Sequence, residues 1–545
     1  MAALPETRAP RLAAAGGWVH PPALERRHPG NAAPLSPPPQ EDTLAPRPLH
    51  SAVAIAVMTL PVHAGAQTPA PSPPDVLRVT RTADDGGEGS LRWAIERSNT
   101  APGRFRIEID PLGQTPHVIM LAAPLPAIKG PVEIEGLAWS RSGEFTALDG
   151  SGYIPDKGDE TCPGAVPGQF GTNVRTTTNP GLAIIDTQGV DISGLEVRNF
   201  CIGILIHRAS GNVVHDNRIV RNRGGAGVML TGDDGSGNPT ATTTMHNKVL
   251  RNAFIDNGDG LELTRGAAFN LVAHNIFRST AANPEPSQGI EILLGHDNVL
   301  VGNRFEGYSD GIQINGGNRN YIAGNIIIGN TFGLSLSGTG NVIDGNTILG
   351  NAVGIAVRPA TPMTVGRISR NLIAGNGQAI TRCFAGGSCD PSLRKGGIVF
   401  GLPSGEHASY VGRRGIGVNP AQASLAKICP DGAPNCQEPP NGGLAAPVIE
   451  SVRKNGTQLA VQGRLKGEPH ARFTVEAFAN RQPGGGEGEI FLGDVVATSD
   501  TDGNGTFVLT ADGAILGAVP ASFTATLTSS DGATSEFSAP VALSE

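Results

Sequence analysis

Hydrophobic and polar positions between about residues 190 and 380 recur with a period near 22 residues. Stretches that begin at Asn298, Asn320 and Asn341 share the pattern N-x-h-x-x-N-x-h-x-x-(N)-x-x-G-h-x-h, in which h is aliphatic. Alternation with a period of two indicates short strands, because successive side chains of a strand point to opposite faces. Three short strands and three turns in each repeat predict one coil of a parallel β-helix.

A glycine column aligns the repeats. Its last spacings are 22, 22 and 21 residues and the earlier ones run from 24 to 33, so insertions are expected at turns. A leucine-rich-repeat horseshoe is the alternative at this period, but it needs a leucine framework and a helix-like return. The column consists of Gly203, Gly227, Gly260, Gly289, Gly311, Gly333 and Gly354.

An asparagine column repeats in the same way. Asn tolerates left-handed backbone and hydrogen-bonds its own turn, so we expect a structural ladder of amides at the ~4.8 Å spacing of neighbouring strands. Its members are Asn217, Asn252, Asn275, Asn303, Asn325, Asn346 and Asn371.

The two ends of the repeat array have different sequences. Residues 90–99 predict a helical N-terminal cap, with Ser90 as the N-cap and Leu91, Ala94 and Ile95 on one face. Beyond a Pro/Gly/Asn-rich linker at 431–444, about seven short alternating strands predict a small β-sandwich over 445–545. The fold class is therefore all-β, with a right-handed parallel β-helix over 76–430 and a sandwich after it.

The N-terminal segment predicts export. Residues 1–50 are rich in Pro, Ala and Arg, and the apolar run Ser51 to Val62 is followed by Ala64-Gly65-Ala66. This order is typical of a signal peptide at about 47–66, with a true start near residues 44–50, although a short buried helix is an alternative. A Pro-rich spacer occupies 67–75. The mature chain is then expected to be secreted, held at the cell surface or periplasmic, with no transmembrane segment.

The amino-acid composition excludes several classes of protein. Among 545 residues, Gly accounts for 75, aromatics for 4% and charged residues for 17%, with a net charge of −8. These values exclude a charged disordered chain and a long coiled coil, and the acidic balance argues against nucleic acid as a partner. We expect a monomer. Six cysteines suggest disulfides rather than a zinc site, with Cys383/Cys389, Cys429/Cys436 and Cys162/Cys201 as candidate pairs.

Acidic residues gather in the outward columns of three middle coils. The position before each glycine and the x position of G-h-x-h supply the candidate catalytic residues Asp259, Glu262, Glu291 and Asp310, whereas flanking coils place apolar or small residues there. Candidate substrate-binding residues at the same place are Gln313, Arg265, His296 and Asn315.

Three parts of the chain carry a resemblance to a known family. They are the opening VTRTADDGGEGSLRWAIERSN with its S-L-R-x-A-I motif, the Asn/Gly coils at 212–376, and the tail from APVIESV to SEFSAP. Together they resemble bacterial exported right-handed parallel β-helix proteins of the pectin-lyase-like superfold with a C-terminal immunoglobulin-like module. This superfold contains lyases, glycoside hydrolases, epimerases and non-enzymatic surface proteins, so it does not select an activity.

Several functions remain open for the acidic columns. Adjacent coils would place Glu262 and Glu291 near the roughly 5–5.5 Å separation of a retaining glycosidase. Asp259 and Asp310 would lie at ~9.6 Å, the upper edge of the inverting range. The resemblance also implies a lyase in which carboxylates hold calcium, here Asp259, Glu262 and Glu291, with Arg265 as a base.

Two observations keep a non-catalytic role open. The chain has neither the N-T-D, D-D and G-H-G set of the polygalacturonases of this superfold nor a clear pectate-lyase arginine motif. Carboxylates on a solenoid also often simply face water. The expected partner is a polysaccharide or surface glycan, which the protein either cleaves or binds as an adhesin-like surface protein.

Overall fold

The computed structural model describes residues 73–544 except 112–116, 155–178, 233–240, 285, 359–363, 381–395, 401–439, 482–484 and 517–521. The predicted leader, signal peptide and most of the spacer lie outside the described residues, as do five of the six cysteines. The sixth, Cys201, is disulfide-bonded. No helix in the described part of the chain is both long and apolar enough to cross a membrane.

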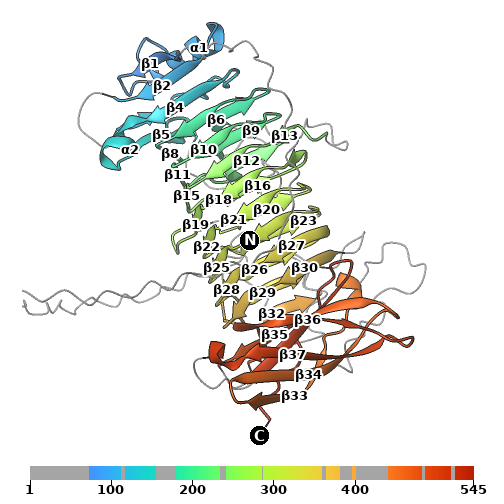
Figure 1. Ribbon diagram of the computed structural model, residues 1–545. Helices are drawn as coiled ribbons and strands as arrows, with labels where there is room; N and C mark the ends of the chain where they lie inside the picture. Colours follow the sequence, from blue (N-terminus) through green and yellow to red (C-terminus); the bar gives the residue numbers. More distant parts are fainter. Residues whose placement is uncertain are drawn as a thin grey trace, which may run out of the picture. The chain divides into compact units, whose positions relative to one another are not determined.

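Three parallel sheets run the length of a β-helix, with one strand of each sheet in most coils (Figure 1). The first sheet contains β1 (Asp75–Val79), β2 (Phe105–Ile109), β4 (Val132–Gly136), β7 (Asp191–Ser193), β10 (Val213–His215), β14 (Lys248–Leu250), β18 (Leu271–Ala273), β21 (Val299–Val301), β24 (Tyr321–Ala323), β27 (Thr339–Asp344) and β30 (Val365–Ser369). The second contains β3 (Val118–Met120), β5 (Thr146–Asp149), β8 (Leu195–Arg198), β11 (Arg218–Val220), β15 (Ala253–Ile255), β19 (Ile276–Arg278), β22 (Arg304–Glu306), β25 (Ile326–Ile328), β28 (Thr347–Leu349) and β31 (Leu372–Ala374). The third contains β6 (Pro180–Ile185), β9 (Ile202–His207), β12 (Ala226–Thr231), β16 (Asp259–Leu263), β20 (Gln288–Leu293), β23 (Asp310–Asn315), β26 (Phe332–Leu336), β29 (Val353–Val357) and β32 (Gly396–Phe400). The predicted parallel β-helix is confirmed.

Asparagine ladders hold the coils in register, as the sequence predicted. In the predicted column, each side-chain amide donates to the amide oxygen of the next coil, for example Asn303 to Asn325 at 3.0 Å and Asn325 to Asn346 at 2.9 Å. A second ladder, which the sequence analysis did not single out, joins Asn212, Asn247, Asn270, Asn298, Asn320 and Asn341. Both ladders are buried, so their hydrogen bonds are shielded from water.

The interior is filled by aliphatic rows and an aromatic stack. Phe254, Phe277 and Phe305 come from successive strands β15, β19 and β22. Their rings stack at centroid distances of 4.4 and 4.8 Å. This stack fills the interior of the coils that carry the acidic columns, since β15, β19 and β22 precede β16, β20 and β23 in the same coils, so the acidic residues lie on a closely packed core.

A helix caps the N-terminal end, as predicted. Helix α1 (Leu91–Thr100) begins after Ser90, whose side chain accepts the backbone N–H of Trp93 at 3.2 Å. Leu91, Ala94 and Ile95 are buried. The short helix α2 (Leu137–Ser142) and the 3-10 turn η1 (Gly150–Gly152) follow β4 and β5, and the two-residue strands β13 (Thr244–Met245) and β17 (Ala267–Ala268) pair at a turn.

Two antiparallel three-stranded sheets form the C-terminal region. One consists of β33 (Val448–Asn455), β34 (Gln458–Lys466) and β37 (Asn504–Asp512), and the other of β36 (Ile490–Thr498), β35 (Arg472–Asn480) and β38 (Ser522–Ser529). Their inner faces share one apolar core. The 3-10 turns η6 (Pro440–Gly443) and η7 (Gly513–Leu516) flank this region.

The sandwich covers the C-terminal end of the β-helix. Phe478 and Phe537 belong to the core of the β-helix rather than to that of the sandwich. Side chains of the sandwich also accept backbone N–H groups of the last coils: Glu476 accepts from Arg370 at 2.9 Å, and Glu536 accepts from Phe400 at 2.8 Å. Strand edges that would otherwise be open are thereby satisfied.

Candidate functional site

The four candidate carboxyl groups lie on three adjacent strands of the third sheet. Asp259 and Glu262 belong to β16, Glu291 to β20 and Asp310 to β23. In the register of the sheet, Glu262 is the partner of Glu291, and Asp310 is the partner of Gln288. The strand assignment thus agrees with the columns read from the sequence.

The glycine column explains why Asp259 and Glu262 share a face. A Cβ atom on Gly260 would lie 2.4 Å from the carbonyl oxygen of Gly289 and 2.6 Å from the ring of Phe277, so only glycine fits there. Because Gly260 and Leu261 both pack inward, residues three apart on β16 can both point outward. A regular strand would place them on opposite faces.

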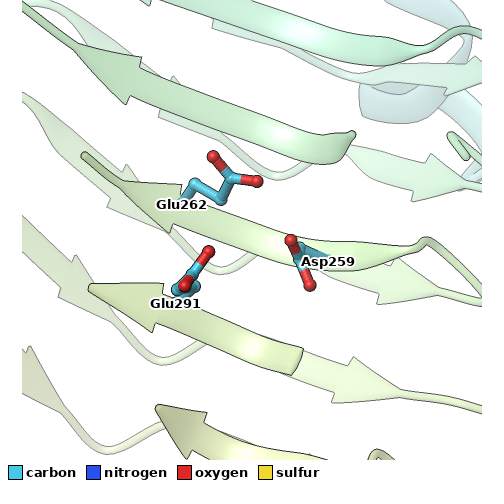
Figure 2. Close-up of side chains that lie close together, drawn as sticks. All are labelled: Asp259, Glu262 and Glu291. Atoms are coloured by element: carbon cyan, nitrogen blue, oxygen red, sulfur yellow. The ribbon is translucent and has the colours of Figure 1, made fainter. Parts of the chain in front are cut away.

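Three of the carboxyl groups converge. One oxygen from each of Asp259, Glu262 and Glu291 lies within 4.8 Å of the other two. Figure 2 shows Asp259 and Glu262 on one strand and Glu291 on the neighbouring strand. This cluster, here called the carboxyl triad, is the most concentrated acidic site that the described side chains form.

The acidic columns point away from the β-helix core, yet most of their side chains are buried. Asp259, Glu262 and Asp310 are 6%, 4% and 2% exposed, and Glu291 alone is partly exposed. The alternative of carboxylates that simply face water is therefore wrong for these three. Burying an acid is costly unless a ligand, a proton or an opposite charge compensates.

Apolar clusters close the acidic region at both ends of the same columns. On the N-terminal side lie Ala183, Ile202, Leu205, Ala226 and Met229, and on the C-terminal side lie Phe332, Val353, Ala356 and Val399. All are buried. The acidic residues therefore span only the coils of β16, β20 and β23, with two inter-coil spacings of ~4.8 Å between the outermost of these strands. Ser335 on β26, the register partner of Gln313, interacts with Asp310 and extends this polar floor by one coil.

Burial raises the pKa of all four candidate carboxyl groups, those of Asp259, Glu262, Glu291 and Asp310, which are called the carboxyl block from here on. The pKa of Glu262 rises well above its usual value through burial and the negative charges of Asp259 and Glu291. The pKa of Glu291 rises to about 8 through burial and the charge of Asp259, against the opposing effect of Arg358. Burial also raises the pKa values of Asp259 and Asp310. The block therefore favours bound protons or a bound cation.

Only some of the carboxyl oxygens of the triad have hydrogen-bond partners among the described residues. A carboxylate oxygen of Asp259 accepts the backbone N–H of Gln288 at 2.9 Å. A hydrogen bond between Asp259 and Glu262 lowers the pKa of Asp259 and raises that of Glu262, as expected if Glu262 carries the shared proton. Oε2 of Glu262 has no hydrogen-bond partner among the residues that the structure describes.

The triad fits the calcium ion that the resemblance implied. Calcium takes carboxylate oxygens at 2.3–2.6 Å, so two ligands on opposite sides of one ion are roughly 4.6–5.2 Å apart. One oxygen of each triad carboxyl group lies within 4.8 Å of the other two, close enough for all three to contact one ion, and Oε2 of Glu262 is buried without a hydrogen-bond partner among the described residues. The donor set is all oxygen, which favours hard cations such as calcium over copper or zinc.

Two of the four candidate binding residues join the block. Gln313 is the register partner of Glu291, and its side chain hydrogen-bonds Asp310. Asn315 is exposed and hydrogen-bonds Glu291.

The other two candidates are placed elsewhere. The ring of His296 contacts Asp297 at 2.8 Å and Thr242 at 3.1 Å, in a turn after β20. The backbone carbonyl of Arg265 accepts the N–H of Gly232 at 2.6 Å, and Arg265 is not among the main influences on the pKa of any of the four carboxyl groups.

Sequence reasoning missed Arg358. Its positive charge lowers the pKa values of both Glu291 and Asp310. The residue lies outside the two outward columns, directly after β29, and no motif marks it. Its burial and its position beside the acidic residues are visible only in the structure.

Two family models match parts of the chain. Residues 240–388 match the family described as "Periplasmic copper-binding protein (NosD)", and residues 168–305 match "Right handed beta helix region". Among solved structures, the periplasmic alginate epimerase AlgG shares 13% identity at a TM-score of 0.31, over 46% of this chain and 66% of that chain. DFA-IIIase from Arthrobacter chlorophenolicus A6 shares 15% identity at a TM-score of 0.31, over 57% of this chain and 73% of that chain.

A curated relative is much more similar. The 3-dehydroshikimate dehydratase of Acinetobacter baylyi is 50% identical over 470 residues, which are 86% of this chain and 95% of the relative. The identity extends over most of both chains. The chain belongs to the family of this 3-dehydroshikimate dehydratase.

Proposed function

We propose that the protein is a dehydratase that removes water from 3-dehydroshikimate at the carboxyl triad. The observation that carries the proposal is a compact, buried set of carboxyl groups in a chain 50% identical to a protein named for this reaction. 3-Dehydroshikimate is a cyclohexene carboxylate with a ring ketone and two neighbouring hydroxyl groups. Loss of one water converts it into a dihydroxybenzoate.

The elimination of water in this reaction needs a proton to move twice. A base takes a proton from the carbon next to the ketone, and the electron pair passes to the ketone oxygen. The electron pair then returns from the ketone oxygen and expels the hydroxyl group on the following carbon, which leaves with a proton as water. Loss of a proton from the remaining ring methylene group and protonation of the ketone oxygen then make the ring aromatic. A carboxyl group beside the ring can perform both transfers, first as base and then as acid.

Glu291 is the residue best placed for these transfers. It is the partly exposed member of the triad, so a ligand can reach its carboxyl group, while Asp259 and Glu262 lie deeper. Asn315 hydrogen-bonds Glu291 and orients it. The buried surroundings exclude water, which strengthens electrostatic interactions with a developing enolate.

The short extent of the polar floor along the sheet favours a substrate with a single ring rather than a polysaccharide. A long glycan would need further polar subsites along the sheet, but the buried apolar clusters occupy those positions on both sides. The polysaccharide or surface glycan expected from the sequence is the second candidate ligand, and the polysaccharide panel described below tests it. A cation bound by Asp259, Glu262 and Glu291 would supply positive charge to polarise an oxygen of that acid.

The test compares substrates on one preparation. Purified protein is incubated with 3-dehydroshikimate, and dihydroxybenzoate is followed by ultraviolet absorbance and chromatography, with a panel of acidic polysaccharides in parallel. We expect product from 3-dehydroshikimate, formed about 10²- to 10⁴-fold more slowly by Glu291→Gln. Unsaturated uronates from the polysaccharides, without product from the small acid, would replace this proposal with the lyase.

Location forms part of the same proposal. An extracytoplasmic protein agrees with the match to a family described as periplasmic and with the disulfide at Cys201. The signal peptide at 47–66 remains a prediction, which N-terminal sequencing of the mature protein tests.

A further inference from the structure

A cavity of about 590 Å³ lies on the outer face of the second sheet. Part of its lining is an outward column in register on β3, β5, β8 and β11, which consists of Val118, Ala147, Glu196 and Arg218. The residues that alternate with this column pack into the core of the β-helix. The volume is in the range of small-molecule pockets. Because the carboxyl block belongs to the third sheet, the cavity is a separate site.

Three arginine side chains line the cavity, and two of them are neutralised by acids. Arg198 donates to Asp149 at 2.8 Å and to Glu196 at 2.7 Å, and Glu196 also pairs with Arg218 at 3.0 Å. These two arginines and two acids balance one another. The remaining acid of the described lining is Glu144, which is exposed, so that water weakens the effect of its charge.

The third arginine, Arg221, differs from the other arginines that share its backbone conformation. Five arginines among the described residues have a positive φ, which is 52° at Arg221. Four of them donate to both oxygens of an aspartate in the previous coil: Arg208 to Asp186, Arg251 to Asp216, Arg319 to Asp297 and Arg370 to Asp344. Arg221 instead donates through Nε to the neutral amide oxygen of Asn199 at 3.3 Å. Its two Nη atoms have no partner among the described residues, so its charge is left for a ligand.

An aromatic side chain forms part of the wall. Phe145, directly before β5, lines the cavity and is half-buried. Its ring stacks on Trp139 of α2 at a centroid distance of 4.6 Å and an interplanar angle of 13°. Trp139 is not part of the described lining, so it supports Phe145 from the far side. A supported ring and a guanidinium group in one cavity suit a ligand that combines a flat ring with a negative charge.

We propose that this cavity, here called the arginine pocket, binds a ring carboxylate at a site separate from the carboxyl triad. The carboxylate pairs with the Nη groups of Arg221, because a guanidinium group offers two parallel N–H bonds to such a group. The ring packs against Phe145. The inference goes beyond the proposed function, since it assigns binding without turnover to a different sheet.

Calorimetry at low ionic strength tests the arginine pocket with three probes: benzoate, benzamide, which lacks the charge, and acetate, which lacks the ring. We expect wild type to bind benzoate roughly 10-fold more tightly than either of the others, and Arg221→Gln to lose most of this difference. The matched control is Arg251→Gln, because Arg251 has the same backbone conformation but pairs with Asp216 at 2.6 Å. This control and Glu291→Gln should bind benzoate as wild type does, and Glu144→Gln should bind it more tightly.

Three results would overturn the inference: no binding of benzoate by wild type, equal affinity of wild type for benzoate and acetate, or unchanged benzoate affinity in Arg221→Gln. Loss of 3-dehydroshikimate turnover in a folded Arg221→Gln would contradict a site separate from the triad. If Arg221→Gln fails to fold, Phe145→Leu decides, since it should weaken benzoate roughly 2- to 10-fold and leave acetate unchanged. Turnover by wild type tests the proposed function on its own, so either can fail without the other.

Discussion

Glu262 on β16 is the register partner of Glu291 on β20, and their carboxyl oxygens lie within 4.8 Å of each other. The backbone ladder fixes this pairing, since Leu261 and Leu263 on either side of Glu262 pair with Ile290 and Ile292. Two acids are thus held together by the same hydrogen bonds that build the coil.

Replacing Glu291 by Gln should abolish proton transfer with little change in shape. We expect kcat on 3-dehydroshikimate to fall by about 10²- to 10⁴-fold, since a positioned acid–base group contributes that much. The matched control is Glu306→Gln, on β22 of the second sheet, where Glu306 is paired with Arg304 at 3.4 Å. Turnover of Glu291→Gln equal to that of the control would remove Glu291 from the mechanism.

Calcium should raise the thermal stability of the protein if the triad binds it. A cation that binds only the folded state stabilises it by mass action, so Tm should rise by a few degrees at calcium concentrations far above the dissociation constant. Asp259→Asn and Glu262→Gln should each reduce that shift, as measured by differential scanning fluorimetry after chelation and dialysis. A Tm that is insensitive to calcium in wild type would remove the ion from the site.

Glu476 should make stability depend on pH. Burial raises its pKa from 4.5 to about 7, and the nearby charge of Asp494 adds to the shift. Between these two values the folded state binds more protons than the unfolded state, so the free energy of unfolding is highest below pH 4.5 and falls as pH rises through 7. The decrease amounts to about 3 kcal/mol at most.

Denaturant titrations at a series of pH values test this dependence. In Glu476→Gln the decrease between pH 4.5 and 7 should largely disappear, because the amide can still accept the N–H of Arg370 but cannot ionise. The exposed residue Glu450, which pairs with Arg464 at 3.6 Å, supplies the control Glu450→Gln. An unchanged pH profile in Glu476→Gln would contradict the assignment.

Asn325→Ala should destabilise the β-helix strongly. The amide of Asn325 donates to Asn346 at 2.9 Å and to the carbonyl of Leu300 at 3.0 Å, and its oxygen accepts from Asn303. Removing it leaves several buried polar groups without partners, at a cost of roughly 2–4 kcal/mol. Asn455→Ala, at an exposed strand end, should cost much less, and equal losses of Tm in the two variants would argue against the ladder as a source of stability.

The repeat predicted the β-helix because its signals are local and periodic. Glycine recurs where a Cβ would collide with the next coil, as at Gly260, and asparagine recurs where a buried amide can bridge coils, as at Asn325. One alignment of the repeats therefore yields both the strand register and the outward columns. The alignment of the repeats alone therefore predicts that Glu262 and Glu291 are partners on neighbouring strands.

The repeat could not predict which outward side chains are buried, or which side chains from other coils extend to the acidic residues. The columns show that Asp310 points out of the coil, but whether an outward residue meets water depends on what packs over it, and no repeat encodes that. Arg358 joins the block only because its long side chain crosses a neighbouring coil. Phe537 enters the β-helix core from another region of the chain, which no pattern within the repeats reveals.

The glycine column also bears on how such a site can arise. Every coil of the array offers the same two outward places, one before the glycine and one two residues after it, and neighbouring coils fill them with pairs such as Ala226 and Met229. Substitution of the two outward residues of a coil changes neither the inward side chains nor the asparagine ladders. New chemistry can therefore be acquired one coil at a time, and an acidic floor can lengthen, shorten or move along the array by two substitutions per step.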